Sequence, residues 1–101
     1  MELKNSRTKE NLMKAFAGES QARNRYTFAA EIAMENDLFV IKKLFDLTAS
    51  QEREHAEVFY KYLSEMDGQE IVIGESSYPV NTSDKIQVQL LQAFDNETRE
   101  A

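Results

Sequence analysis

A glutamate and a histidine three positions apart, Glu52 and His55, form the pair with the clearest chemistry in the sequence. Residues at this spacing share one face of an α-helix, so a carboxylate and an imidazole would point to the same spot. Such a mixed set suits iron, manganese or zinc, whereas calcium takes oxygen ligands alone. Because a bare Glu-x-x-His is common by chance, the interpretation depends on what lies opposite it.

Glu19 supplies that support, because it falls in the apolar stripe of the preceding helical segment. Glu52 and His55 fall in the apolar stripe of their own segment, which predicts three ionisable side chains facing the interior. Taken singly, each has a plainer explanation: a hydrogen-bonded core histidine, an edge glutamate, or a pair between Glu19 and Arg23. Together, a Glu on one helix and Glu-x-x-His on its antiparallel neighbour make half of a di-metal carboxylate site.

Two further carboxylates, Glu97 and Glu100, repeat the three-residue spacing near the end of the sequence. They share a helical face with Ile86, Leu90 and Ala93. An exposed acidic turn would explain them alone. Beside Glu19, they are predicted to be additional metal ligands.

The elements that must position these residues are helical. Apolar residues recur every three to four positions, and there are only 3 glycines and 1 proline, which favours an all-α fold. Residues 1–101 are expected to form one domain, and the short break near Asn36 predicts an antiparallel hairpin from its first two helices. Helices are predicted over about 7–34, 37–66 and 84–101, with a connection over 67–83.

Composition excludes several other classes. With 12 Lys and Arg against 18 Asp and Glu, the net charge of −6 disfavours binding to nucleic acids or anionic membranes. The sequence has no cysteine, which excludes disulfides, thiol catalysis and cysteine-ligated metal sites in this chain. No apolar run is long enough to span a bilayer, and residues 1–10 do not resemble a secretory signal, so a cytoplasmic location is expected.

Two segments carry a resemblance to a known family. Residues 16–26, Phe-Ala-Gly-Glu-Ser-Gln-Ala-Arg-Asn-Arg-Tyr, resemble the first-helix signature of the rubrerythrins, and residues 51–56, Gln-Glu-Arg-Glu-His-Ala, resemble the second. The resemblance is strong over about residues 5–66 and weaker over 81–101. It implies a ferritin-like four-helix bundle around a di-iron centre. It also implies reduction of hydrogen peroxide to water with electrons from an attached rubredoxin domain.

By motif position, the resemblance makes Glu19 a terminal iron ligand, Glu52 a bridging carboxylate and His55 a histidine ligand. Iron is the metal that the family implies. Manganese and zinc remain compatible with the same ligands.

The third-helix motif matches less closely. Asn96 stands where the family has glycine, ahead of Glu97 and Glu100. The resemblance makes Glu97 the other terminal ligand and Glu100 a carboxylate that ligates iron in one redox state. It also lets the Tyr26 hydroxyl bond to a ligand carboxylate, and Tyr26 and Glu100 are the candidate catalytic proton donors.

The sequence resembles a short form of the family, without the fourth helix, its second Glu-x-x-His, or the rubredoxin domain. The hairpin and partial third helix would then complete a four-helix bundle by forming a homodimer or higher oligomer, or with a companion chain. A twofold dimer of hairpins would supply two copies of the Glu19, Glu52 and His55 set. Electrons would have to come from an external donor such as a rubredoxin.

Three functions follow from these features. The expected one is a di-iron oxidoreductase that reduces hydrogen peroxide and protects against oxidative stress. The second is an iron-oxidising half-ferritin that feeds mineral storage. The third is non-catalytic, either a metal-stabilised helical dimer or an inactive fragment.

Overall fold

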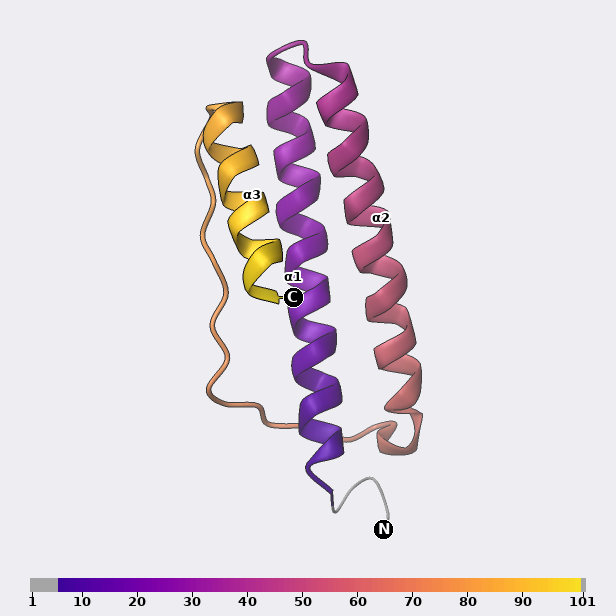
Figure 1. Ribbon diagram of the computed structural model, residues 1–101. Helices are drawn as coiled ribbons and strands as arrows, with labels where there is room; N and C mark the ends of the chain where they lie inside the picture. Colours follow the sequence, from indigo (N-terminus) through magenta and orange to yellow (C-terminus); the bar gives the residue numbers. More distant parts are fainter. Residues whose placement is uncertain (1–5, 101) are drawn as a thin grey trace.

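The computed structural model describes residues 6–100, and the side chains of residues 6–97 (Figure 1). The expectation of an all-helical chain is confirmed, since no strand occurs within residues 6–100. The elements in chain order are α1 (Thr8–Glu35), α2 (Phe39–Tyr62), the short 3-10 helix η2 (Ser64–Met66) and α3 (Ile86–Glu100).

A tight turn folds α1 and α2 into an antiparallel hairpin. The backbone N–H of Asn36 donates to the carbonyls of Ile32 and Ala33, which closes the last turn of α1. Asp37 then adopts a left-handed conformation with φ of 59°, a position where helices often carry glycine or asparagine. The chain reverses within these few residues, so the two helices pack along their whole lengths (Figure 1).

Small side chains allow the two helices to approach closely. The distance between packed helices depends on the side chains at the contact, and here these are mostly alanine. Tyr26 of α1 and Phe45 of α2 are the large residues of this core, and their rings stack with centroids 6.1 Å apart. The buried core consists of Ala22, Tyr26, Ala29, Ala30, Ala33, Phe45, Ala49 and Ile86.

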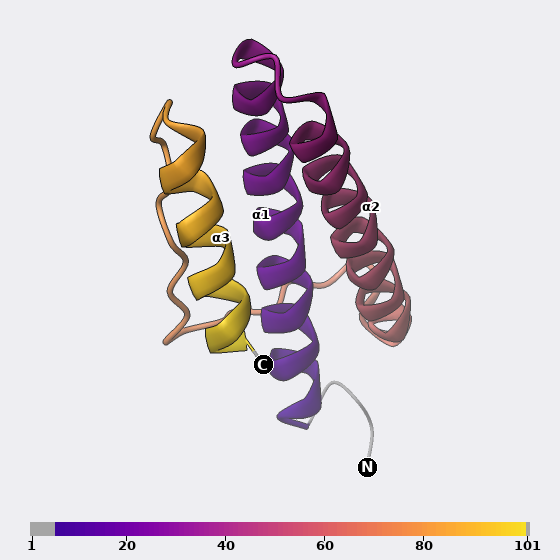
Figure 2. The same ribbon diagram turned by 45° about the horizontal axis from the view of Figure 1, so that its top comes forward.

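A long connection returns the chain to the other end of the hairpin before α3 begins. Residues 67–85 run along the molecule without regular structure, and α3 then descends beside α1, parallel to α2 (Figures 1 and 2). In both views α1 lies between α2 and α3. This order gives α1 two helical neighbours and leaves α2 and α3 with one each.

Polar side chains hold α3 in place. The side-chain amide of the buried Asn96 donates to Oδ1 of Asn81, in the connection, at 3.0 Å. Gln89, also buried, donates to the carbonyls of Asn81 and Ser83 at 3.1 and 2.8 Å. Buried polar groups are costly unless they are hydrogen-bonded, so these contacts fix the register of α3 against the connection.

The helix bounds differ modestly from those expected. The second helix ends at Tyr62 instead of continuing to residue 66, because η2 replaces its last turn. Gly68, with φ of 81°, follows this turn. Across residues 6–100, no helix has the combination of length and apolar character needed to cross a bilayer.

Candidate metal centre

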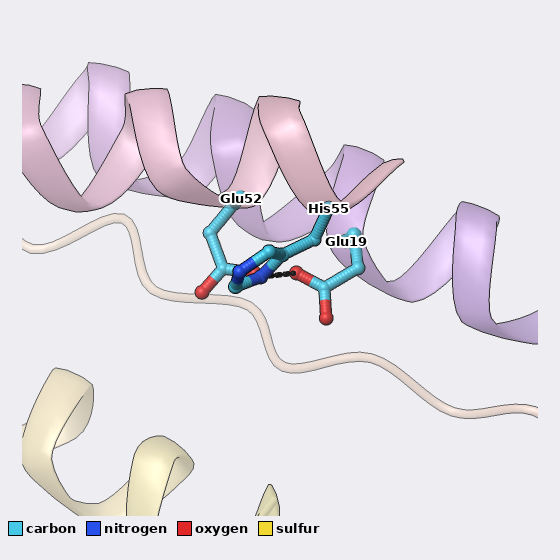
Figure 3. A group of neighbouring side chains, drawn as sticks. All are labelled: Glu19, Glu52 and His55. Carbon is cyan, nitrogen blue, oxygen red and sulfur yellow. Dashed lines mark ion pairs between the residues drawn. The ribbon is translucent and has the colours of Figure 1, made fainter. Parts of the chain in front are cut away.

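Three side chains converge on one point between α1 and α2. Glu19 comes from α1, and Glu52 and His55 come from successive turns of α2 (Figure 3). One potential ligand atom from each lies within 4.8 Å of the others. A single metal ion could contact all three with small side-chain adjustments, since ligand bonds to such metals are about 2 Å long.

The three residues differ in their exposure to solvent. Glu52 is 8% exposed, and the side chain of Glu19 is 26% exposed, so both carboxylates are largely withdrawn from water. The His55 side chain is 60% exposed. The expectation that His55 faces the interior is therefore wrong for this chain alone, because no helix within residues 6–100 covers that side of α2.

The electrostatics of the group favour a bound cation. The Oε2 atom of Glu19 is buried and has no hydrogen-bond donor, although His55 Nδ1 lies 3.6 Å away. A buried carboxylate oxygen without a donor carries an uncompensated desolvation cost, and the carboxylate of Glu52 adds repulsion. A divalent metal would relieve both, and two carboxylates with one imidazole form a donor set suited to iron.

Tyr26 and Glu97 form a second, separate contact. The buried Tyr26 hydroxyl donates a hydrogen bond to the carboxylate of Glu97 on α3. Tyr26 follows Glu19 by seven residues, which is two turns along the same face of α1. Glu97 does not belong to the three-residue group, so its role as a metal ligand stays a prediction.

Glu100 is the last residue of α3, but its side chain lies outside those that the structure describes. Its predicted roles as a ligand and proton donor therefore stay predictions. The same is true of the assignment of Tyr26 as a proton donor, although the structure places its hydroxyl against a carboxylate.

The residues that orient α3 were not identified from the sequence. Arg25 donates to Oδ1 of Asn81 at 3.4 Å, and its guanidinium lies 5.5 Å from the centre of the Tyr26 ring. Asn81 thus joins α1, the connection and α3, the elements that bring Glu97 to Tyr26. In the sequence, Asn81 stands in a cluster of turn-forming residues. Such a cluster predicts a turn but does not predict a long-range contact.

The sequence model of the rubrerythrin family matches residues 10–98. The chain belongs to the rubrerythrin family. This confirms the resemblance, which was strong in the first two helices and weaker in the third. Rubrerythrins are di-iron proteins of the oxidoreductase class, and the group formed by Glu19, Glu52 and His55 could hold a metal.

Individual rubrerythrins match most of the chain. Rubrerythrin-1 of Clostridium acetobutylicum is 51% identical over 83 residues, which cover 81% of this chain and 43% of that protein. The rubrerythrin of Clostridium perfringens is 46% identical over 79 residues, covering 77% of this chain and 40% of that protein. The rubrerythrin of Nitratidesulfovibrio vulgaris is 51% identical over 61 residues, which are 60% and 32% of the two chains. The chain thus spans less than half the length of these curated relatives.

Proposed function

We propose that this rubrerythrin-family chain forms half of a di-iron centre that reduces hydrogen peroxide to water. The observation that carries the proposal is the convergence of Glu19, Glu52 and His55, with a buried Glu19 oxygen that no donor satisfies. These residues supply one Glu and one Glu-x-x-His. A complete site in a four-helix bundle uses two of each.

The family resemblance assigns the roles of these side chains. By motif position, Glu52 would be a bridging carboxylate, Glu19 a terminal ligand and His55 a histidine ligand, and the low exposure of Glu52 is compatible with its role. When bound, two ferrous ions supply the two electrons that peroxide reduction requires. Tyr26 holds a proton against the Glu97 carboxylate, and Glu100 is proposed as a second proton donor one turn further along α3.

An apolar groove supports completion of the bundle by another helix. The groove, here called the α2–α3 groove, encloses about 270 Å³, with Tyr26 in its lining. Its apolar walls include Leu44, which is 58% exposed, and Phe94, which is 75% exposed. Contiguous exposed apolar surface of this kind marks interaction sites. The remaining lining residues are Ile41, Phe45, Thr48, Leu90, Ala93 and Glu97.

The position of α3 constrains which assembly can form. Figure 2 shows α1 flanked by α2 and α3, and in the proposed four-helix bundle these helices would occupy three of the four positions. One helix from a companion chain would complete the bundle directly. A twofold dimer of hairpins needs two positions, so α3 would first have to leave its place beside α1.

The function is tested by comparing Glu52→Gln with Glu54→Gln, a matched control at an exposed position on the same helix. Under anaerobic conditions the wild-type chain should bind about one Fe(II) per chain, because two copies share a two-metal site. The bound Fe(II) should be oxidised faster by peroxide than by dissolved oxygen. Glu52→Gln should lose tight binding, and Glu54→Gln should retain it.

Two outcomes would contradict the proposal. Unchanged iron stoichiometry in Glu52→Gln would show that Glu52 does not bridge the metals, provided that circular dichroism shows equal helix content in both variants. Faster oxidation by oxygen than by peroxide would favour the iron-oxidising half-ferritin instead.

A further inference from the structure

One face of α2 holds a row of large apolar side chains in water. These side chains are between 49% and 74% exposed, and they belong to Val40, Leu44, Leu47, Val58 and Tyr62. Gln51 and His55, both exposed, complete the row between Leu47 and Val58. We call these seven residues the α2 stripe. By the helical repeat, the stripe lies roughly 130° round α2 from the side that packs on α1.

The spacing of the α2 stripe is symmetric about its centre. From Val40 to Gln51 the steps are 4, 3 and 4 residues, and from Gln51 to Tyr62 they are again 4, 3 and 4. Eleven residues in three turns is about 3.67 residues per turn, so the stripe runs almost straight along the helix. An interface between two copies related by a twofold axis must match itself. Two antiparallel copies of this stripe do match, step for step, when the axis passes at Gln51.

The side chains that would meet in this register are compatible. Val40 would face Tyr62 of the second copy, and Leu44 would face its Val58, so a smaller side chain meets a larger one each time. Gln51 would face Gln51, where each amide can donate to the other across the axis. A shifted register would instead bury these amides against apolar groups without a partner, which is costly. A single polar residue in an apolar seam fixes the register of paired helices in this way.

The charges of the chain also favour a second copy on this face. Each copy has a net charge of −6, so two copies repel each other over most of their surfaces. None of the seven residues of the α2 stripe is Asp, Glu, Lys or Arg, on a chain in which these types make up 30%. Two copies can therefore meet along the stripe without burying a carboxylate or an ammonium group. The exposed Lys43, Glu54 and Lys61 would flank the contact at its rim, where solvent screens them.

We propose that two copies of this chain pair antiparallel through the α2 stripe, about a twofold axis at Gln51. The inference rests on the proposed function for the metal, and it deepens that function by naming a second copy as the partner of the half site. Glu52 follows the axis residue directly, so the two Glu52 residues would be offset by about 3 Å along the helices and the two His55 residues by about 12 Å. The two Glu-x-x-His pairs would thus flank one axis, as a shared two-metal site requires.

Because the sequence has no cysteine, introduced cysteines can report which residues meet across the axis. Full-length variants are treated with a short bismaleimide under anaerobic conditions, with and without Fe(II), and dimers are counted on denaturing gels. Gln51→Cys should cross-link at least about tenfold more than Ser50→Cys, an exposed neighbour that points away from the stripe by about 100°. Circular dichroism of both variants checks that the helices are intact.

A pair of off-axis positions tests the register itself. Leu44→Cys alone should cross-link poorly, because the two copies of residue 44 would lie about 21 Å apart along the helices. Val58→Cys alone should cross-link poorly for the same reason. A mixture of the two variants should form the cross-linked heterodimer, since residue 44 of one copy faces residue 58 of the other.

The pairing and the proposed function can fail separately. Equal cross-linking of Gln51→Cys and Ser50→Cys would overturn the pairing, and so would cross-linking of Leu44→Cys with itself in preference to Val58→Cys. If residue 51 does not cross-link, but the wild-type chain binds about one Fe(II) per chain and reduces peroxide, the function stands and the pairing is wrong. Register-specific cross-linking by a chain that binds no iron would support the pairing and contradict the function.

Discussion

The carboxylate of Glu19 is only partly compensated within the candidate site. Its Oε2 atom is buried without a hydrogen-bond donor, and His55 is 3.6 Å away and mostly in water. Folding the chain without metal therefore brings Glu19 towards Glu52 at an electrostatic cost. A bound cation would offset this electrostatic cost. Because the metal binds the folded state, it would stabilise that state against unfolding.

Glu19→Gln should therefore stabilise the apo chain and weaken its response to metal. Removing the charge relieves repulsion at a largely buried position, for which we expect a gain of about 1 kcal/mol in the free energy of unfolding. Fe(II) should raise the Tm of the wild type but raise that of Glu19→Gln much less. Thermal melts under anaerobic conditions, with Glu31→Gln as an exposed control on α1, provide the measurement. Equal Tm values for apo and iron-loaded wild type would contradict this account.

At the scale of elements, α3 is positioned by hydrogen bonds more than by apolar burial. Of its large apolar side chains, Ile86 is buried, but Leu90, Leu91 and Phe94 remain exposed. Asn96 instead makes the buried contact, to Asn81 in the connection. Asn96 stands where the family motif has glycine, and its side chain forms a hydrogen bond that glycine could not form.

Asn96→Ala should loosen α3 without unfolding the hairpin. The variant loses one buried hydrogen bond and leaves Asn81 with the longer bond from Arg25, a loss of about 1 kcal/mol. Amide hydrogen exchange in α3 should accelerate about fivefold, while that in α1 and α2 stays unchanged. Gln87→Ala, at an exposed position in α3, is the control. Equal protection of α3 in both variants would show that its apolar contacts suffice.

The hairpin was predictable because its signals are local. The spacing of Glu52 and His55 and the helical stripe containing Glu19 place three candidate ligands near one another before any tertiary contact is known. The placement of α3 was not predictable, because it depends on the path of residues 67–85 and on side chains that meet across it. The exposure of His55 was also missed, since periodicity identifies a face of α2 but not whether another helix covers it.

At the scale of the whole molecule, the chain has an open position beside α2 and α3. A small three-helix unit buries a limited core, and here the α2–α3 groove leaves large apolar side chains in water. The same side of α2 carries His55, so a helix in the groove would cover both the apolar surface and the exposed ligand. Completion of the fold and completion of the metal site are therefore expected to be one event.

Self-association through the groove should therefore depend on its apolar walls and on iron. We expect the wild-type chain to form dimers or larger oligomers in sedimentation velocity, more strongly with Fe(II), because metal bound between copies stabilises the assembly. Leu44→Asp places a charge on the α2 wall of the groove, which faces the partner whether or not α3 stays beside α1, and should raise the dissociation constant by at least about tenfold, since an unpaired charge cannot be buried cheaply. Val72→Asp, at an exposed position in the connection, should leave association unchanged. A wild-type chain that stays monomeric with and without iron would contradict assembly between copies and leave a companion helix as the occupant of the groove.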